Sequence, residues 1–108
     1  MNLSDYSFHD STILEVKEMS SEQAIEYLIN FPVNWKENIF EHYVLKFKGV
    51  LFYLVDEIPF VGEPTILDIE ASKETDTVRK IAIITNAGRR EIHYSSIELD
   101  KAKEKTDL

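Results

Sequence analysis

Apolar residues recur at every second position along much of the chain, which is the spacing of strands with one buried face. The longest apolar stretch is the sixteen-residue segment Phe40–Val55 (FEHYVLKFKGVLFYLV), rich in the Val, Phe and Tyr that favour strands. One strand of that length is unusual, and Gly49 inside it indicates a bulge, a bend or a change of sheet. The part after Gly49 is apolar on both faces, which predicts a strand at the centre of a covered sheet. We therefore expect Leu45, Phe47 and Phe52 to be buried.

The same alternation predicts further strands before and after this stretch. Thr12–Met19 and Thr65–Ala71 alternate apolar and charged residues. Val78–Thr85 and Arg90–Leu99 flank Asn86–Arg89, a turn signal containing glycine. With Ala87-Gly88 at the tip, Ile83 would face Ile92 and Ile81 would face Tyr94, which places all four side chains on one apolar face.

The segment Glu22–Phe31 fits two structures. As a strand it places Ile25, Tyr27 and Ile29 on one face, and as a helix it would be capped by Ser20 or Ser21. The period of two is the better fit, so we predict a strand that ends at Pro32 because proline cannot donate to a ladder.

These elements predict a mainly β fold with six to seven short antiparallel strands in a curled sheet, a sandwich or a partly open barrel. The alternative is an α+β fold with residues 22–31 helical. A chain of 108 residues with 44% hydrophobic residues can build one core without disulfide or metal staples. We predict one globular domain over residues 1–100 and a polar C-terminal tail over 101–108.

The charge of the chain bears on its partners. Twenty acidic and twelve basic residues give a net charge of −8. Seven of the acids lie in Asp56–Thr77 with Lys73 as the one base, so this acidic segment carries −6. Such a field disfavours nucleic acid and favours a basic protein partner. A competing interpretation is that the acids simply keep a small protein dissolved.

Other compartments and chemistries have little support in the sequence. There is no cysteine, which excludes disulfides and thiolate sites. The N-terminus lacks the pattern of a signal peptide, and no apolar run is long enough for a membrane span. We expect a cytoplasmic protein that does not bind membranes.

An apolar loop interrupts the acidic segment. Ile58, Phe60 and Val61 lie between Asp56 and Pro64, where two prolines stiffen the chain. They are too apolar for open solvent, so we expect the loop to lie against the core or against a partner. An apolar anchor ringed by charge is a common interface plan. The predicted binding residues are Trp35, Glu57, Phe60, Val61, Glu63 and Glu70, with a protein partner; a homodimer stays open.

The tripeptide His9-Asp10-Ser11 is the main candidate for chemistry. Adjacent residues point in different directions and cannot form a catalytic relay by themselves. Asp10 or Ser11 capping a turn is the favoured interpretation. The alternative is a small-ligand pocket or a minor enzyme site at His9 and Asp10.

Catalytic and metal signatures are otherwise missing from the sequence. Glu91 and His93 share a strand face, but two ligands at that spacing are weak evidence for a metal site. No GxSxG, HExxH or nucleotide-binding fingerprint occurs. We expect no catalytic residues, no cofactor and no metal.

Three segments carry a resemblance. Phe8–Leu14 (FHDSTIL), Leu45–Val50 (LKFKGV) and Pro64–Ile69 (PTILDI) resemble stretches of small uncharacterised bacterial β-rich proteins. Some of those proteins, with a similar HDS-plus-strand opening, are grouped with immunity proteins of polymorphic toxin systems. The resemblance implies a non-enzymatic bacterial binding protein that blocks a partner toxin, and it assigns no catalytic residues.

Overall fold

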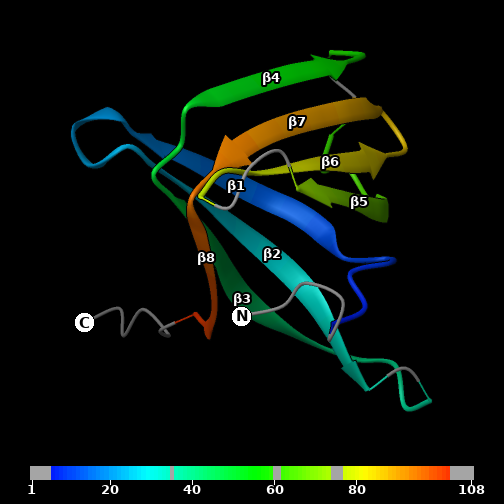
Figure 1. Cartoon of the computed structure of the whole chain (residues 1–108). Helices are drawn as coiled ribbons and strands as arrows, with labels where there is room; N and C mark the ends of the chain where they lie inside the picture. The colour runs from blue at the N-terminus through cyan, green and yellow to red at the C-terminus, as the bar shows by residue number, and fades with distance from the viewer. Residues whose placement is uncertain (1–5, 35, 60–61, 74–76, 103–108) are drawn as a thin grey trace, which may run out of the picture.

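The computed structural model describes residues 6–34, 36–59, 62–73 and 77–102. It is mainly β, with eight strands and one short 3-10 turn, η2, at Ser20–Glu22 (Figure 1). The strands are β1 (Thr12–Met19), β2 (Ala24–Asn34), β3 (Ile39–Lys48), β4 (Phe52–Glu57), β5 (Ile66–Lys73), β6 (Arg79–Thr85), β7 (Gly88–Tyr94) and β8 (Ser96–Lys101).

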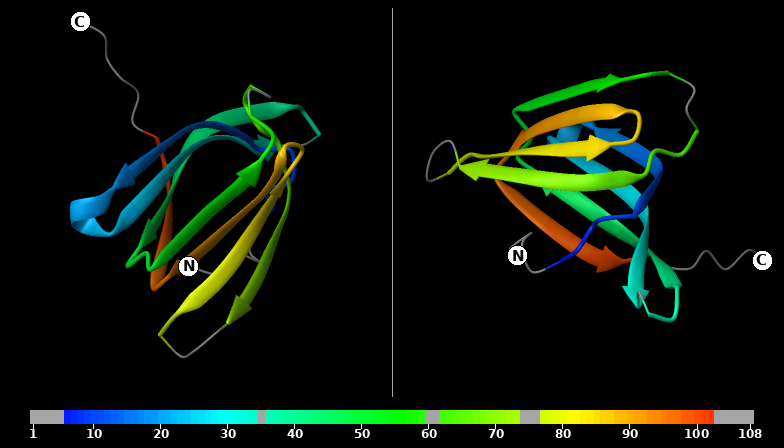
Figure 2. Two further views of the ribbon diagram at one scale, coloured as in Figure 1. Left: turned by 90° about the horizontal axis from the view of Figure 1, so that it is seen from above. Right: turned by 90° about the vertical axis from the view of Figure 1, so that its right-hand side faces the viewer.

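The strands form two antiparallel four-stranded sheets. One sheet has the order β1-β2-β3-β8 and the other has the order β4-β7-β6-β5. The two sheets face each other across a shared core, as the two views of Figure 2 show. The predicted mainly β fold is therefore confirmed in its sandwich form, and Glu22–Phe31 lies mostly in a strand, as predicted, rather than in a helix.

Two long bent segments, β3–β4 and β7–β8, pair with each other and link the two sheets. β3 continues into β4 past Gly49, and β7 continues into β8 past Ser95. Both segments therefore pass from one sheet to the other at the same corner. The Ser95 amide donates to the carbonyl of Lys48 at 2.9 Å. Gly49 has φ +63°, and a Cβ there would lie 2.6 Å from Ser95 Oγ. The predicted bend at Gly49 is confirmed, and it is a change of sheet.

The opposite corner is closed by the start of β1 and the segment before β5. Thr12 and Thr65 form an isolated antiparallel bridge, and the Ile13 amide donates to the carbonyl of Pro64 at 2.8 Å. The sheets are thus joined at two corners. β4, at one border of its sheet, and β8, at one border of the other, pair on one side only among the described residues.

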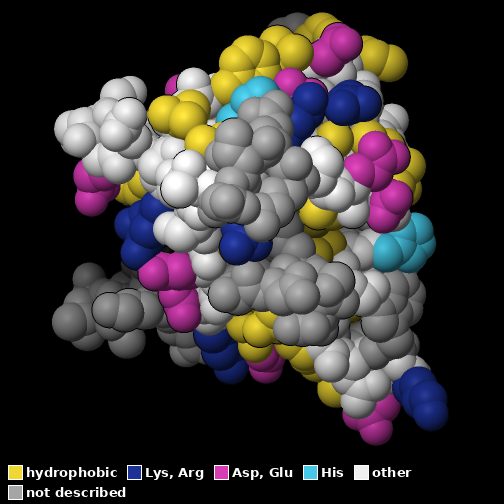
Figure 3. All heavy atoms as spheres, viewed as in Figure 1, with side chains coloured by type: hydrophobic (Ala, Val, Ile, Leu, Met, Phe, Trp, Pro, Cys, Tyr) yellow, Lys and Arg dark blue, Asp and Glu magenta, His cyan; other side chains and the backbone are white. Residues whose placement is uncertain are grey.

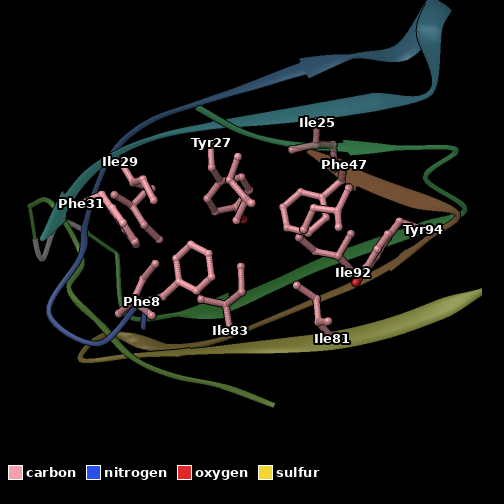
Figure 4. Packing of buried hydrophobic residues seen from close by; sticks show 14 residues of the cluster. Phe8, Ile25, Tyr27, Ile29, Phe31, Phe47, Ile81, Ile83, Ile92 and Tyr94 are labelled. Carbon is pink, nitrogen blue, oxygen red and sulfur yellow. The ribbon is translucent and has the colours of Figure 1, made fainter. Parts of the chain in front are cut away.

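The inward faces of both sheets fill the space between them. Tyr27 and Leu45 come from one sheet and Ile83 and Ile92 from the other, and each is fully buried. Aromatic rings make edge-to-face contacts across this layer, such as Phe47 with Tyr94 at 5.2 Å between ring centroids, a favourable geometry. Figure 4 shows Tyr27 and Phe47 from one sheet pointing toward Ile83 and Ile92 from the other.

The position of the strand after Gly49 differs from the prediction. β4 is a border strand rather than a central one. Leu45 and Phe47 are fully buried as predicted, but Phe52 is 42% exposed, so its predicted burial is wrong. Apolar residues on both faces of a strand are typical of a central position. Here the strand lies at a border of its sheet, and several of these residues are exposed.

The last hairpin has a different register from the predicted one. Ile81 lies opposite Ile92, and Ile83 lies opposite Arg90, because the tip is Asn86-Ala87 rather than Ala87-Gly88. The shift of two residues keeps Ile81, Ile83 and Ile92 on the buried face, since side chains alternate with a period of two. The predicted face is correct and the predicted partners are wrong.

Three boundaries also differ. β2 continues through Pro32 to Asn34, where its pairing with β3 shifts register; proline is tolerated at such an irregular point. The predicted strand Arg90–Leu99 is two strands, because the chain changes sheet at Ser95. β8 ends at Lys101, one residue inside the predicted tail, and residues 103–108 lie outside the described residues.

Candidate interaction surface

β4 exposes apolar side chains on a border of the molecule. Five of them, in and beside the strand, are between 42% and 67% exposed, and together they are called the β4 apolar surface: Leu51, Phe52, Leu54, Val55 and Ile58. Figure 3 shows hydrophobic side chains gathered along the upper border, over β4. Side chains alternate along the strand, so Phe52 and Leu54 lie on one face of β4 and Val55 on the other. Exposed apolar residues grouped on one strand are a candidate interaction site, whereas isolated ones need no explanation.

The inner face of β4 is fixed to the core by an ion pair. Arg90 Nε and one of its terminal nitrogens donate to the two carboxylate oxygens of Glu57, each at 2.7 Å. Thr85 Oγ1 donates to the same carboxylate at 3.0 Å. The side chains of Arg90 and Glu57 are only 10% and 8% exposed. This bidentate geometry is the stronger form of carboxylate pairing.

Electrostatics keep this pair ionised. Burial alone would raise the pKa of Glu57, but the hydrogen bonds and charge of Arg90, with the hydrogen bond from Thr85, hold that pKa below its ordinary value. Burial alone would lower the pKa of Arg90, but its bonds to Glu57 and Tyr27 raise it. Glu57 therefore carries its charge in the folded protein and has that charge neutralised locally.

A second contact fixes the start of β4. The hydroxyl groups of Tyr53 and Tyr27 share a 2.7 Å hydrogen bond, and Arg90 donates to the Tyr27 hydroxyl at 3.2 Å. Burial and the neighbouring Tyr53 raise the pKa of Tyr27 far above its ordinary value, so the Tyr27 hydroxyl stays neutral. β4 is thus held at both ends, and its free border is a rigid surface. Rigid surfaces lose less conformational entropy on binding.

Charged residues lie beside the apolar ones on the outer face of this sheet. The carboxylate of Glu91 lies 3.6 Å from Lys80 Nζ, 3.4 Å from an Arg89 nitrogen and 3.2 Å from His93 Nε2. Partial burial would by itself raise the pKa of Glu91, but the hydrogen bond from His93 and the charge of Lys80 outweigh it and lower that pKa. The His93 ring packs on Phe52 with 4.7 Å between centroids. This cluster links β7 to the exposed side of β4.

The predicted acidic residues lie in different places. Glu57 lies in the buried pair with Arg90. Glu63 and Glu70 are exposed, and Glu70 lies on β5, at the other border of the sheet from β4. Three strand spacings separate those borders, roughly 14 Å. Asp56 is the exposed acid that lies within β4 itself.

The predicted apolar anchors are only partly described. Trp35, Phe60 and Val61 lie outside the described residues. Ile58, from the same loop, is 67% exposed. The sequence predicted that this loop lies against the core or against a partner, and Ile58 is not packed in the core.

His9 and Asp10 lie on the other side of the molecule, at the turn before β1. Asp10 has φ +69°, and the Ser11 amide donates to the carbonyl of Phe8 at 2.9 Å, so the tripeptide forms a tight turn. His9 Nδ1 donates to the carbonyl of Leu67 at 2.8 Å. A hollow of about 300 Å³ is lined by Tyr6, Ser7, Phe8, His9, Leu67, Asp68, Ile69 and Ala71.

This hollow does not bring together the groups that chemistry would need. Asp10 and a second histidine are not among its lining residues. Within the described ranges, no three residues of the metal-binding types lie close enough to hold an ion. His9 is placed by a backbone contact that links the turn to β5.

A second hollow lies where β4 begins. It has a volume of about 330 Å³ and separates the tip of the β1–β2 hairpin from β4; its lining is Glu18, Met19, Ser20, Gln23, Ala24, Ile25, Val50 and Tyr53. The Val50 amide donates to the carbonyl of Gln23 at 2.8 Å, and both residues line the hollow. None of the five residues of the β4 apolar surface lines this hollow.

Comparison with known proteins gives a fold and no function. No family model and no curated protein matches the chain. A solved structure, the crystal structure of an uncharacterized protein from Neisseria gonorrhoeae, is similar with a TM-score of 0.65. Its sequence is 14% identical, and the match covers 89% of this chain and 95% of that one. At this identity the similarity supports the two-sheet fold alone. In the part of the chain that the structure describes, no helix is long and apolar enough to cross a membrane.

Sequence reasoning missed the surface that the structure exposes. Leu51, Phe52 and Leu54 belong to the most apolar run of the chain, which favours burial, and nothing in that run marks a sheet border. A usable signal was the short, charged connection: β4 ends with Asp56-Glu57 and is followed by a loop with two prolines, which are common beside border strands.

Proposed function

We propose that this chain is a non-enzymatic protein-binding module that binds a basic protein through the β4 apolar surface. The observation that carries the proposal is a border strand, hydrogen-bonded to the core through Tyr53 and Glu57, with five exposed apolar side chains in and beside it. The resemblance implies that this chain is an immunity-type inhibitor. In that case the basic partner would be the toxin that it blocks.

The charge of the chain supports a basic partner. The net charge is −8. Three exposed acids belong to the acidic segment: Asp56 within β4, Glu63 in the loop after it, and Glu70 on β5 at the other border of the sheet. Exposed acids raise the rate at which a basic protein meets the surface, whereas the apolar contacts set how slowly it leaves. The small-ligand alternative at His9 has weaker support, because the hollow there lacks Asp10 and a second histidine.

The test compares two equivalent leucines at opposite borders of one sheet. Leu54 on β4 is 51% exposed and Leu67 on β5 is 43% exposed. The wild type, Leu54→Lys and Leu67→Lys are each used to capture proteins from a lysate of the organism that encodes the chain, after circular dichroism confirms that all three are folded.

We expect the wild type and Leu67→Lys to retain the same basic protein and Leu54→Lys to lose it. The two lysines add the same charge, so a difference between them reports the position of the site. Equal capture by all three variants, or no specific capture by the wild type, would refute the proposal. Loss with Leu67→Lys alone would move the site to the hollow beside His9.

A further inference from the structure

We propose that β4 also pairs with β4 of a second copy of this chain, antiparallel about a two-fold axis, to join the two β4-β7-β6-β5 sheets into one. This inference rests on the proposed function in one respect: the dimer covers the surface that the partner would bind. Self-pairing would then keep an exposed border strand from unspecific pairing until the partner displaces it.

The backbone at the border of β4 is oriented for such pairing. The Ile58 amide donates to the carbonyl of Ala87 at 2.9 Å, and the register from Phe52 to Glu57 against β7 has no shift. In an antiparallel pair the bonded positions alternate. At the start of the strand the pairing is irregular, since the Leu51 amide donates to the carbonyl of His93 at 2.9 Å. From Phe52 onward the even-numbered residues bond to β7, so the amide and carbonyl groups of Tyr53, Val55 and Glu57 point to the open border.

These groups suit a two-fold axis. When Val55 lies opposite Val55 of the second copy, each amide meets the other carbonyl, as the symmetry of an isologous contact requires. The same register places Tyr53 opposite Glu57 and Phe52 opposite Ile58 of the second copy. Figure 1 and the right-hand view of Figure 2 both show β4 as the outer border of the molecule, with no described strand beyond it.

Local charge permits a second copy despite the net charge of −8. Residues Val50 to Val55 carry no charge, and Glu57 is neutralised by Arg90 at 2.7 Å. Asp56 would lie opposite Leu54 of the second copy rather than opposite another acid. The repulsion between two copies is thus long-range, and salt screens it. Self-association should strengthen as salt is added, whereas binding to a basic partner should weaken.

The available area sets the strength of this dimer. From their exposed fractions, the five side chains present on the order of 500 Å² of surface, similar to the largest apolar patch of an ordinary monomer. Two copies would bury about 1,000 Å², the low end for specific interfaces. We therefore expect a weak dimer that partner binding can replace.

Proline substitution separates border pairing from folding. Val55→Pro removes an amide that points away from β7, so the β4–β7 ladder is kept while the border bond to a second copy is lost. Lys101→Pro is the matched control. The Ala102 amide donates to the carbonyl of His42, so by the same alternation the Lys101 amide points to the free border of β8.

The experiment is sedimentation equilibrium of the wild type and both variants, at low and at high salt, up to about 1 mM protein. We expect the wild type and Lys101→Pro to dimerise, several-fold more tightly at high salt, and Val55→Pro to dimerise at least tenfold more weakly. Amide NMR of the wild type adds a readout that needs no variant: on dilution, the signals of Tyr53, Val55 and Glu57 should shift more than those of Leu54 and Asp56.

Two results would overturn the inference: a wild type that stays monomeric at about 1 mM in high salt, or dimerisation of a folded Val55→Pro variant as tight as the wild type. The outcomes of the two proposals are separable. A monomeric wild type whose partner capture is lost with Leu54→Lys removes the dimer and keeps the proposed function. A dimer that Val55→Pro breaks, together with partner capture that Leu54→Lys does not affect, would support the dimer and refute the proposed function.

Discussion

Replacing Glu57 with glutamine tests the structural role of the buried ion pair. The substitution keeps the size of the side chain and removes its charge, so Arg90 stays buried with weaker hydrogen bonds. Leaving one member of a buried pair uncompensated costs about 3–5 kcal/mol, and an exposed pair contributes about 0–1. The side chains here are 10% and 8% exposed, so we expect a loss of about 2–4 kcal/mol. That is a large share of the roughly 5–15 kcal/mol that stabilises a domain.

The assay is urea denaturation at pH 7, monitored by circular dichroism, and two further variants serve as controls. Glu98→Gln removes the charge from an ion pair in which both side chains are nearly half exposed, so its urea midpoint should stay nearly unchanged. Glu57→Leu combined with Arg90→Met replaces the pair by apolar groups and should recover most of the stability that Glu57→Gln loses. A Glu57→Gln midpoint equal to that of the wild type, or a double variant less stable than Glu57→Gln, would refute the reasoning.

The same pair predicts a dependence on pH. The pKa of Glu57 in the folded protein is lowered from its ordinary value of 4.5. A lowered folded-state pKa stabilises the protein above the unfolded-state pKa, and this contribution is lost as the pH falls through the folded-state value. The stability difference between the wild type and Glu57→Gln should therefore be constant above about pH 5 and shrink below pH 4.5. A difference that stays constant down to pH 2 would mean that the charge of Glu57 contributes nothing.

Five further variants test separate parts of the fold and the surface, the first four by urea denaturation. Phe47→Ala should cost about 3–5 kcal/mol because Phe47 is fully buried, whereas Phe52→Ala should cost under about 1.5 because Phe52 is 42% exposed; equal costs would contradict the border position of β4. Gly49→Val should cost about 2–4 kcal/mol, since φ is +63° and Ser95 Oγ lies 2.6 Å from the new Cβ, and an unchanged midpoint would mean that the corner can adjust. Ser11→Ala should leave stability unchanged or raise it by up to about 1 kcal/mol, because Ser11 Oγ is buried with no hydrogen-bond partner among the described residues; a loss above that value would reveal a bond to another group. Glu63→Gln combined with Glu70→Gln should slow association with the basic partner at low salt in stopped-flow measurements, and an unchanged rate would remove steering from the proposal.

The sequence by itself determined most of the strands and, for several of them, the face that is buried. Alternation predicted Thr12–Met19, and the face of Ile81, Ile83 and Ile92, because a side chain on a strand points to one of two sides regardless of the partner strand. Gly49 marked the point where the long apolar stretch changes direction, since a positive φ favours glycine. These features are local, and local chemistry was enough to predict them.

Tertiary structure alone decided which strands are neighbours and which borders stay open. The register of the last hairpin differs from the predicted one by two residues, and the buried face is the same in both. The alternation of side chains therefore could not distinguish the two registers. Glu57 and Arg90 are 33 residues apart, and no spacing in the sequence connects them. The run from Leu51 to Val55 is apolar enough for a sheet centre, yet β4 lies at a border because β3 and β4 belong to different sheets. An apolar strand can satisfy its hydrophobic faces in the chain's own core or against another chain, and only the three-dimensional arrangement shows which faces the core leaves uncovered.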